Sequence, residues 1–470
     1  MRLRQRGGET MDGNVQTEET LEFDWPQVDE PTVPPPGPPP EPPRRRPRLR
    51  LRLSRAPIHR RRRRLAVFFV SAPLVGVAIA LVILLAAGSG PSARERAQLA
   101  AAGPGTLGHG AAATAIQRTM AAMPLPRRVA QLFVMGTTAR GPGDPFFSSL
   151  RSTGWGGVML SPLDPGTAGH LNPRFGAAAR QAGGVTPLVV ATQPGGQGSI
   201  FSGLPPRSAP AVGKSGDPAV AAKEATAAAK ALQRLHVSMT LAPDADVGSI
   251  TGPDQDVSYG DAPRLVARMT AAAVRAYNRA GIISAVGHFP GEGAASDDPD
   301  TTTATVGLSL NGLRGRDLRP FRAVAKTAPV VVMSNAVYAA YDGVTPAVLL
   351  PEVVGGLLRH ELGFKGVVMT DDLGSTAPVL GQSVGASAVQ ALEAGADLLY
   401  VADPAQQQQA YRAVLAAVRR GTISRQRLRI SLERVLALKR RHGLLPAPPP
   451  ARSAQPALAF QAAHAPTRGR

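Results

Sequence analysis

Carboxylates stand directly after two apolar runs of this sequence, where they could do chemistry. The run at 285–289 leads into a loop with Asp298 and Asp300, and a second run ends on Asp371 and Asp372. An apolar run that stops abruptly at acidic residues is typical of a barrel strand that presents reactive groups at its carboxyl end. Two carboxylates from different strand ends can face each other across a pocket. Such a pair is the minimum that cleavage of a glycosidic bond requires.

The elements that would position these carboxylates form a regular pattern from residue 124 to residue 445. Short apolar runs alternate there with helical stretches rich in Ala, Arg and Leu, which is typical of β/α units. Eight strands over this length predict an α/β fold, a closed (β/α)8 barrel of the TIM type. The strands are expected at residues 132–136, 156–161, 187–192, 238–242, 282–288, 330–335, 366–371 and 397–402. Among the helices between them are those expected at 218–235, 262–280, 349–361 and 383–394.

An open, doubly wound sheet is the alternative architecture for this pattern. That fold usually carries a glycine-rich phosphate-binding loop after its first strand. The residues that follow the first expected strand, 136–141, read GTTARG and match such a loop poorly. The closed barrel is therefore the preferred prediction.

The composition limits the classes to which this protein can belong. The chain has 470 residues, of which 43% are hydrophobic, so it can bury a substantial core. It has no cysteine, which excludes disulfides, thiolate metal sites and a cysteine nucleophile. Bacterial domains are often exported without disulfides, so this composition is compatible with a location outside the cytoplasm.

The net charge of +20 could suggest a nucleic-acid-binding protein. Much of the excess, however, lies in one arginine cluster from Arg44 to Arg64, directly before the most apolar segment of the chain. Basic residues at that place are better explained by membrane topology than by recognition of bases, and no nucleic-acid-binding motif accompanies them. We therefore expect no nucleic-acid partner.

The apolar segment runs from Leu65 to Ala87 without a charge and is long enough to cross a bilayer. We expect an uncleaved transmembrane signal anchor, with residues 1–64 as a disordered, Pro/Arg-rich cytoplasmic tail. A cleaved signal peptide is the alternative, but its basic region would be unusually long and no clear cleavage site follows. The sequence thus predicts a single-pass protein of the cell membrane with its barrel outside the cytoplasm. An Ala/Gly-rich spacer is expected at 88–123 and a Pro/Ala-rich tail at 446–470.

Several of these motifs resemble glycoside hydrolase family 3, in its single-domain β-N-acetylglucosaminidase (β-N-acetylhexosaminidase) branch. The resemblance covers about residues 125–445 and is strongest at 361–373, ELGFKGVVMTDDL. It implies a retaining mechanism that needs no metal or organic cofactor. In the family the first Asp of the Thr-Asp-Asp-Leu run is the nucleophile, which here is Asp371. Judged from the residues alone, Asp371 could instead be the N-cap of the following helix.

The acid/base of the family is replaced in this chain. Relatives read Lys-His-Phe-Pro-Gly-His-Gly in this loop and end it in an Asp-x-His pair whose histidine shuttles the proton. Here the second histidine of the motif is Glu292, and the pair becomes Asp298-Pro299-Asp300. We expect Asp300 to act as the acid, with its pKa raised by burial and by the charges of Asp297 and Asp298. Glu292 is a second candidate, and a solvated acidic surface loop is the alternative.

Three charged sugar ligands of the family are also replaced. Thr192 stands where relatives carry Asp, Val257 where they carry Arg, and Gly287 where they carry Lys. Hydrogen bonds from charged groups are the stronger kind, so their loss should weaken sugar binding. In this chain the substrate contacts are expected to come from His288, Thr192, Glu292 and Asp372. Asp246, by contrast, is expected to shape its loop.

The leading hypothesis from the sequence is a membrane-anchored retaining glycoside hydrolase that cleaves β-linked amino sugars, such as those of cell-wall peptidoglycan. The replaced ligands motivate a second hypothesis, a catalytically silent barrel that binds a glycan or a partner protein. A third makes the arginine-rich tail the functional part, which would dock on anionic lipid or on a cytoplasmic partner.

Overall fold

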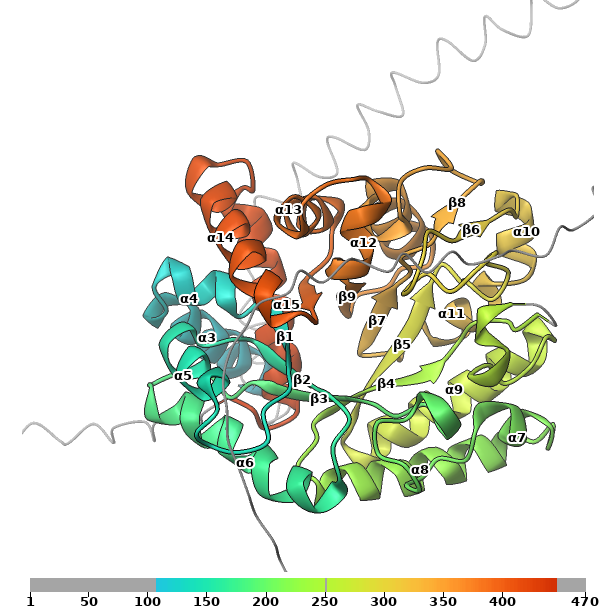
Figure 1. Cartoon of the computed structure of the whole chain (residues 1–470), viewed down its shortest axis with the longest axis horizontal. Helices are drawn as coiled ribbons and strands as arrows, with labels where there is room; N and C mark the ends of the chain where they lie inside the picture. The colour runs from blue at the N-terminus through green and yellow to red at the C-terminus, as the bar shows by residue number, and fades with distance from the viewer. Residues whose placement is uncertain (1–106, 250–251, 446–470) are drawn as a thin grey trace, which may run out of the picture. The chain divides into compact units, whose positions relative to one another are not determined.

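The computed structural model describes residues 107–249 and 252–445, and these contain the predicted barrel (Figure 1). Eight parallel strands close on themselves, because the first strand pairs with the second and also with the last. The closed (β/α)8 prediction is confirmed, and the open sheet is excluded. The strands of the barrel are β1 (Phe133–Thr137), β2 (Gly157–Leu160), β3 (Leu188–Thr192), β4 (Met239–Asp244), β5 (Ile283–Phe289), β7 (Val330–Met333), β9 (Val367–Asp372) and β10 (Leu398–Val401).

Helices surround the strands and cover the outside of the barrel (Figure 1). They are α4 (Leu125–Ala130), α5 (Pro145–Thr153), α6 (Pro165–Gln181), α7 (Ala209–Gly213), α8 (Pro218–Arg234), α9 (Pro263–Ala280), α10 (Leu310–Gly315), α11 (Leu318–Val324), α12 (Leu373–Val379), α13 (Val384–Ala394), α14 (Pro404–Arg420), α15 (Arg425–Arg441) and a π-helix, η5 (Glu352–Glu361). Three short 3-10 helices complete the set among the described residues: η2 (Gly196–Gly198), η3 (Pro253–Asp256) and η4 (Ala347–Leu349). All four helices expected from the sequence are present.

An Asp-Pro pair begins four of these helices. Proline fits the first helical position because its missing N–H has no partner there, and aspartate is a favoured N-cap. In α5, α6, α8 and α14 the aspartate side chain accepts a hydrogen bond from a backbone N–H in the first turn. These aspartates are Asp144, Asp164, Asp217 and Asp403.

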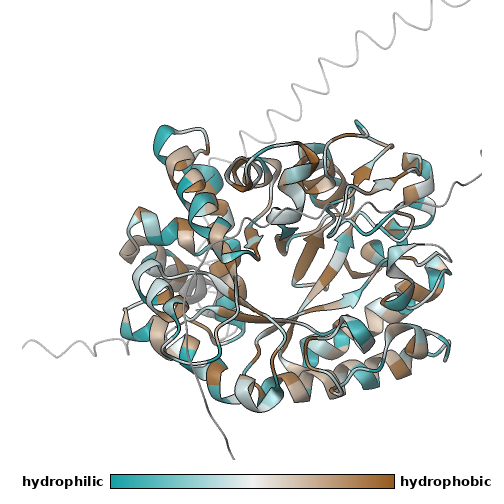
Figure 2. Ribbon diagram, viewed as in Figure 1, coloured by the Kyte–Doolittle hydropathy of each residue, from teal (hydrophilic) through white to brown (hydrophobic). Residues whose placement is uncertain are grey.

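Apolar residues fill the strands and the inner faces of the helices, while polar residues lie on the outside (Figure 2). Most strand residues are buried, as expected for parallel strands packed on both faces. The hydrophobic core also includes contacts from α3 (Leu107–Ala122), a helix within the segment predicted to be a spacer. Ile116 and Met120 of α3 pack against the core of the barrel. The described part of the chain therefore joins the barrel before residue 124.

Two short strands that the sequence did not predict lie beside the barrel. β6 (Thr305–Val306) pairs with β8 (Val337–Tyr338) in a separate sheet of two strands. This pairing joins the segment after β5 to the segment after β7. It anchors one end of the loop 290–304, which carries the predicted acid.

No helix among the described residues is long and apolar enough to cross a membrane. The predicted anchor from Leu65 to Ala87 lies outside the described residues, as do the tails at 1–64 and 446–470.

One buried lysine gives a prediction about stability. Lys439 of α15 is fully buried, and its ammonium donates to Gln131 Oε1 at 2.7 Å. Burial lowers the pKa of Lys439 to about 7. Between about pH 7 and the ordinary lysine pKa of 10.5, the unfolded chain binds more protons than the folded one. The free energy of unfolding therefore rises with pH in this range. We expect the free energy of unfolding of the wild type to gain about 2 kcal/mol relative to Lys439→Met between pH 7 and pH 9.

Urea unfolding of both proteins at several pH values measures this difference. Comparing the two proteins cancels the titration of groups that they share. A difference in unfolding free energy that stays constant across this range would contradict the pKa of Lys439.

Candidate active site

A cleft of about 400 Å³ opens at the carboxyl ends of the barrel strands. This is the face where barrel enzymes carry their reactive groups. The polar residues that line it come from β3, β4, β5, β9, β10, α12 and the loop 290–304. They include Thr192, Asp244, His288, Asp300, Asp371 and Asp372.

Asp371 lies near the end of β9 and is only 9% exposed. Its Oδ1 accepts the backbone N–H of Asp372 at 2.8 Å, and its Oδ2 lies 3.5 Å from His288 Nε2. The N-cap of α12 is Asp372, whose Oδ1 accepts the N–H groups of Gly374 and Ala402. The alternative role for Asp371 as the helix cap is therefore wrong, and its carboxylate faces the cleft.

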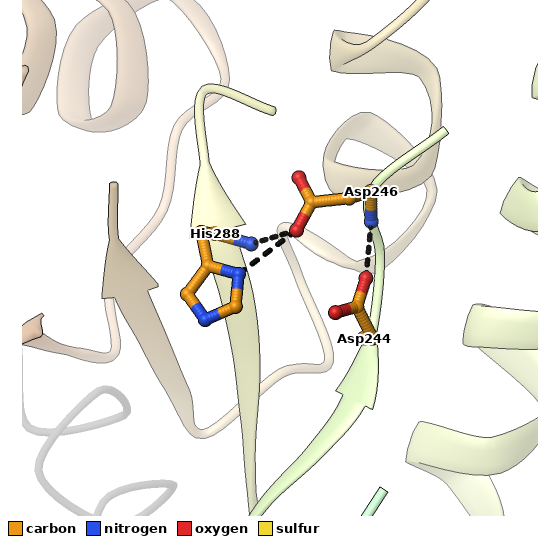
Figure 3. Close-up of side chains that lie close together, drawn as sticks. All are labelled: Asp244, Asp246 and His288. Atoms are coloured by element: carbon orange, nitrogen blue, oxygen red, sulfur yellow. Dashed lines mark hydrogen bonds and ion pairs between the residues drawn. The ribbon is translucent and has the colours of Figure 1, made fainter. Parts of the chain in front are cut away.

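A network of carboxylates orients His288 (Figure 3). Asp246 Oδ2 accepts the backbone N–H of His288 and lies 2.9 Å from its ring Nδ1, while Glu292 Oε1 lies 3.1 Å from the same nitrogen. Asp246 Oδ1 accepts the N–H of Glu292, and the N–H of Asp246 itself is bonded to Asp244 Oδ1. Because Asp246 and Glu292 hold Nδ1, the ring points its Nε2 toward Asp371.

The same carboxylates set the charge of His288. Burial alone would lower its pKa, but the charges of Glu292, Asp246 and Asp371 raise the pKa of His288 well above its ordinary value. The ring is therefore an imidazolium at neutral pH. Burial raises the pKa of Asp371 above its ordinary value, and the positive charge of His288 offsets only part of this rise.

Asp300 lies in the loop 290–304, on the rim of the same cleft. Its backbone N–H donates to Asp298 Oδ1 at 2.9 Å, and Ser375 Oγ of α12 donates to its carbonyl oxygen at 3.0 Å. The pKa of Asp300 is raised to about 7, chiefly by the charge of Asp371 and then by burial. Asp300 keeps much of its surface open to the cleft, so the neighbouring charge is the main cause. Below about pH 7 Asp300 is therefore protonated, which suits a general acid.

Of the other predicted site residues, two line the cleft and two do not. Thr192 and Asp372 line it, and so do Val257 and Gly287, the positions where relatives carry charged ligands. Asp298 is exposed and holds the backbone of Asp300. Glu292 is buried behind His288 and is not among the lining residues of the cleft.

Sequence reasoning passed over Asp244 as a site residue, although the structure places it in the cleft. The available signal was its position at the end of a strand, which is the signal that singled out Asp371. Asp246 shapes its loop, as predicted, and also holds His288.

Three of these side chains lie close enough together to hold a metal ion. The ligand atoms of Asp244, Asp246 and His288 all lie within 4.8 Å of one another. Both oxygens of Asp246 already accept hydrogen bonds, however, and one of them faces His288 Nδ1 (Figure 3). The arrangement works as a hydrogen-bonded support for His288 and offers poor ligands to a metal.

Comparison with known proteins agrees with the geometry. The sequence model of the glycosyl hydrolase family 3 N terminal domain matches residues 130–438. A beta-hexosaminidase of Stenotrophomonas maltophilia is 32% identical over 237 residues, which are 48% of this chain and 70% of the relative.

Solved structures of similar fold carry related names. A family 3 beta-N-acetylglucosaminidase from a Paenibacillus species is 32% identical with a TM-score of 0.64, and the match covers 71% of this chain and 65% of that one. A beta-N-acetylhexosaminidase from Beutenbergia cavernae is 28% identical with a TM-score of 0.62, and the match covers 67% of this chain and 98% of that one. The chain spans about two thirds of the Paenibacillus protein and nearly all of the Beutenbergia protein. It belongs to glycosyl hydrolase family 3, a family of O-glycosyl hydrolases.

Proposed function

We propose that this protein is a retaining glycoside hydrolase that cleaves the β-glycosidic bonds of amino sugars. One observation carries the proposal: the cleft brings the carboxyl groups of Asp371 and Asp300 together, and the charge of Asp371 raises the pKa of Asp300 to about 7. The names of the relatives, beta-hexosaminidase and beta-N-acetylglucosaminidase, support an amino sugar as the substrate.

The reaction proceeds in two displacements. Asp371 attacks the anomeric carbon and forms a glycosyl ester, while Asp300 gives its proton to the departing glycosidic oxygen. Asp300, now a carboxylate, then takes a proton from water, which attacks the anomeric carbon and releases Asp371. The imidazolium of His288, 3.5 Å from Asp371, stabilises the carboxylate before attack and after release.

Trapping of the glycosyl ester tests the proposal directly. A 5-fluoro glycosyl fluoride of N-acetylglucosamine forms a glycosyl ester with a retaining enzyme, and this ester is hydrolysed slowly. We expect mass spectrometry of the digested protein to find one added sugar on the peptide that contains Asp371. A sugar on a different residue would overturn the assignment, and labelled protein that still turns over substrate would do the same.

The pH dependence follows from the pKa of Asp300. The acid works only when it is protonated, so kcat/KM should fall above about pH 7. In Asp300→Asn this limb should vanish, and the rate on glycosides with poor leaving groups should drop by about 10²-fold or more. Substrates with a 4-nitrophenol leaving group need less protonation and should lose less. Measurement of kcat/KM from pH 5 to pH 9 on both kinds of substrate checks this, and an unchanged limb in the variant would exclude Asp300.

We also propose that the barrel lies outside the cytoplasm and is held to the membrane by an anchor from Leu65 to Ala87. The sequence supports this location, because this uncharged run is long enough to cross a bilayer and follows an arginine cluster. Peptidoglycan is the polymer of β-linked amino sugars that such a barrel would meet. Alkaline phosphatase fused after residue 445 should be active in bacterial cells, and an inactive fusion of normal abundance would contradict this orientation.

A second candidate function is a silent barrel that binds glycan without cleaving it. The cleft carries no charge at three positions where relatives have charged ligands, which are Thr192, Val257 and Gly287. This observation favours weak or altered sugar contacts. Sugar binding by calorimetry, without turnover of any of a panel of 4-nitrophenyl β-glycosides, would support this candidate.

A further inference from the structure

We propose that a basic seam on the outside of the barrel, formed by α9, α11 and the hollows at their two ends, binds a linear phosphodiester polymer that carries no bases. The polymer is recognised through its phosphate groups. The hollows share no lining residue with the catalytic cleft. The inference therefore goes beyond the proposed function and does not depend on it.

Arginines form a stripe along α9. Arg264, Arg268, Arg275 and Arg279 are all exposed. At about 3.6 residues per turn, these four positions point within about 60° of one another, and at about 1.5 Å per residue they extend over about 22 Å. The sequence of α9 contains no acidic residue, so no carboxylate of the helix itself balances the charge of the stripe.

The neighbouring helix supplies the other wall of the seam. α9 packs against α11, and a hollow of about 560 Å³ opens beside the first turns of α9 (Figure 1). Two of its seven lining residues are alanines and the other five are Arg264, Arg268, Arg314, Arg319 and Arg322. Among the described residues, the carboxylate that pairs with these arginines is that of Glu361, at 2.7 Å from Arg314 and 3.5 Å from Arg322. Guanidinium groups therefore dominate this hollow.

The basic surface continues to the other end of the two helices. A second hollow, of about 470 Å³, is lined there by Lys326, Lys365 and Arg441, and its lining contains no acidic residue. The side-chain amide of Asn278 of α9 donates to the carbonyl oxygen of Thr327 at 2.8 Å, which joins α9 to the loop after α11. The arginine stripe runs along α9 from the first hollow toward the second. Cationic side chains thus follow the whole length of the seam.

The residue types of the seam indicate phosphate as the group that it binds. The planar guanidinium of arginine matches two phosphate oxygens with two parallel hydrogen bonds. A row of cations neutralises a row of phosphates on one chain and releases the counterions of that chain, which a single small anion cannot do. A polymer with phosphates at regular intervals therefore fits the seam better than an isolated phosphate does.

The same surface argues against nucleic acid and against a bilayer. Proteins that bind single-stranded nucleic acids offer aromatic side chains on which the bases stack. The aromatic residues of α9 and α11, Tyr277 and Phe321, are buried, and neither hollow has an aromatic lining residue. A flat bilayer surface cannot enter the hollows, whereas a single polymer chain can. A polymer of sugar-alcohol phosphates meets all of these conditions.

The test measures the binding of fluorescently labelled poly(glycerol phosphate) to the full chain in a neutral detergent. We expect Arg264→Gln combined with Arg268→Gln to weaken binding by about tenfold or more and to reduce its salt dependence, because fewer counterions are released. The matched control is Arg412→Gln combined with Arg419→Gln, which removes two exposed arginines from α14, across the barrel from α9 (Figure 1). An equal unfolding temperature shows that each variant is folded.

The control should bind the polymer as the wild type does. Equal losses in the two variants would show that net charge alone attracts the polymer. Unchanged binding in the α9 variant would assign the polymer to another part of the chain, such as the arginine cluster at 44–64. Either result would overturn the inference.

Two further probes distinguish the polymer from other sources of phosphate. Oligothymidylate and mixed micelles that contain phosphatidylglycerol are titrated against the wild type and the α9 variant. We expect the substitutions to weaken binding of poly(glycerol phosphate) at least as much as binding of either probe. A larger loss for oligothymidylate would identify the seam as a nucleic-acid site, and a larger loss for phosphatidylglycerol would identify it as a membrane-docking surface. Both of these results would overturn the inference.

Discussion

Replacement of Asp371 by asparagine is expected to lower kcat by at least about 10³-fold. Asparagine has the same shape as aspartate, but its amide is neutral and a poor nucleophile, so the glycosyl ester cannot form. The fold should survive, because Asp372 rather than Asp371 caps α12. Purified wild-type and variant proteins assayed on 4-nitrophenyl β-glycosides give the comparison, and an equal thermal unfolding temperature shows that the variant is folded.

Azide makes this test more specific. In Asp371→Gly a small anion can enter the space of the missing carboxylate and attack the anomeric carbon from the same face. The product should be the α-glycosyl azide, with inverted configuration. Azide added to Asp300→Gly should instead give the β-glycosyl azide, because it intercepts the ester that Asp371 still forms. A kcat unaffected by Asp371→Asn would remove this residue from the reaction.

Replacement of Asp397 by asparagine is expected to lower the free energy of unfolding by about 3–5 kcal/mol. Asp397 is fully buried just before β10, and its two oxygens contact three arginines. Arg359 of η5 lies at 2.5 Å, and Arg427 and Arg434 of α15 both lie at 3.1 Å. The substitution leaves these cations without the charge that compensates their burial. Chemical unfolding of both proteins at pH 7 measures the loss.

Glu361→Gln is the matched control for Asp397→Asn. Glu361 also pairs with arginines, Arg314 at 2.7 Å and Arg322 at 3.5 Å, but both arginines are more than 40% exposed. Exposed pairs contribute less than about 1 kcal/mol, so this variant should be nearly as stable as the wild type. Similar losses in the two variants would show that burial does not decide the strength of these pairs.

The barrel could be predicted because its strands are the apolar runs of the chain. Each expected strand overlaps an observed one, and the ends differ by at most two residues. Parallel strands covered on both faces leave little room for polar residues, so their limits are visible in the sequence. The strands β6 and β8 have two residues each and leave no such pattern.

The carboxylates of the site could be predicted in part. Asp371 was found because it ends an apolar run, and Asp300 because it stands where the resemblance places a histidine. The structure brings both to one cleft. The place of Glu292 could not be predicted, since the turn after β5 decides whether its side chain enters the cleft or passes behind His288. That turn is fixed by the bond from the Glu292 N–H to Asp246, which is distant in sequence.

The buried charges outside the site escaped sequence reasoning for another reason. Lys439 lies in a helix rich in arginine, where a basic residue usually faces solvent. A signal was nevertheless present, because Lys439 continues the apolar stripe of Leu428, Leu432 and Val435 at helical spacing.

The two carboxylates of the proposed reaction differ in how the chain holds them. Asp371 is part of the barrel wall, whereas Asp300 lies on a loop fastened at one end by β6 and against α12 by Ser375. A substitution of Asp300 itself therefore changes no strand of the barrel. The proposed nucleophile is thus built into the scaffold, whereas the proposed proton donor can be replaced by another residue type at little risk to folding.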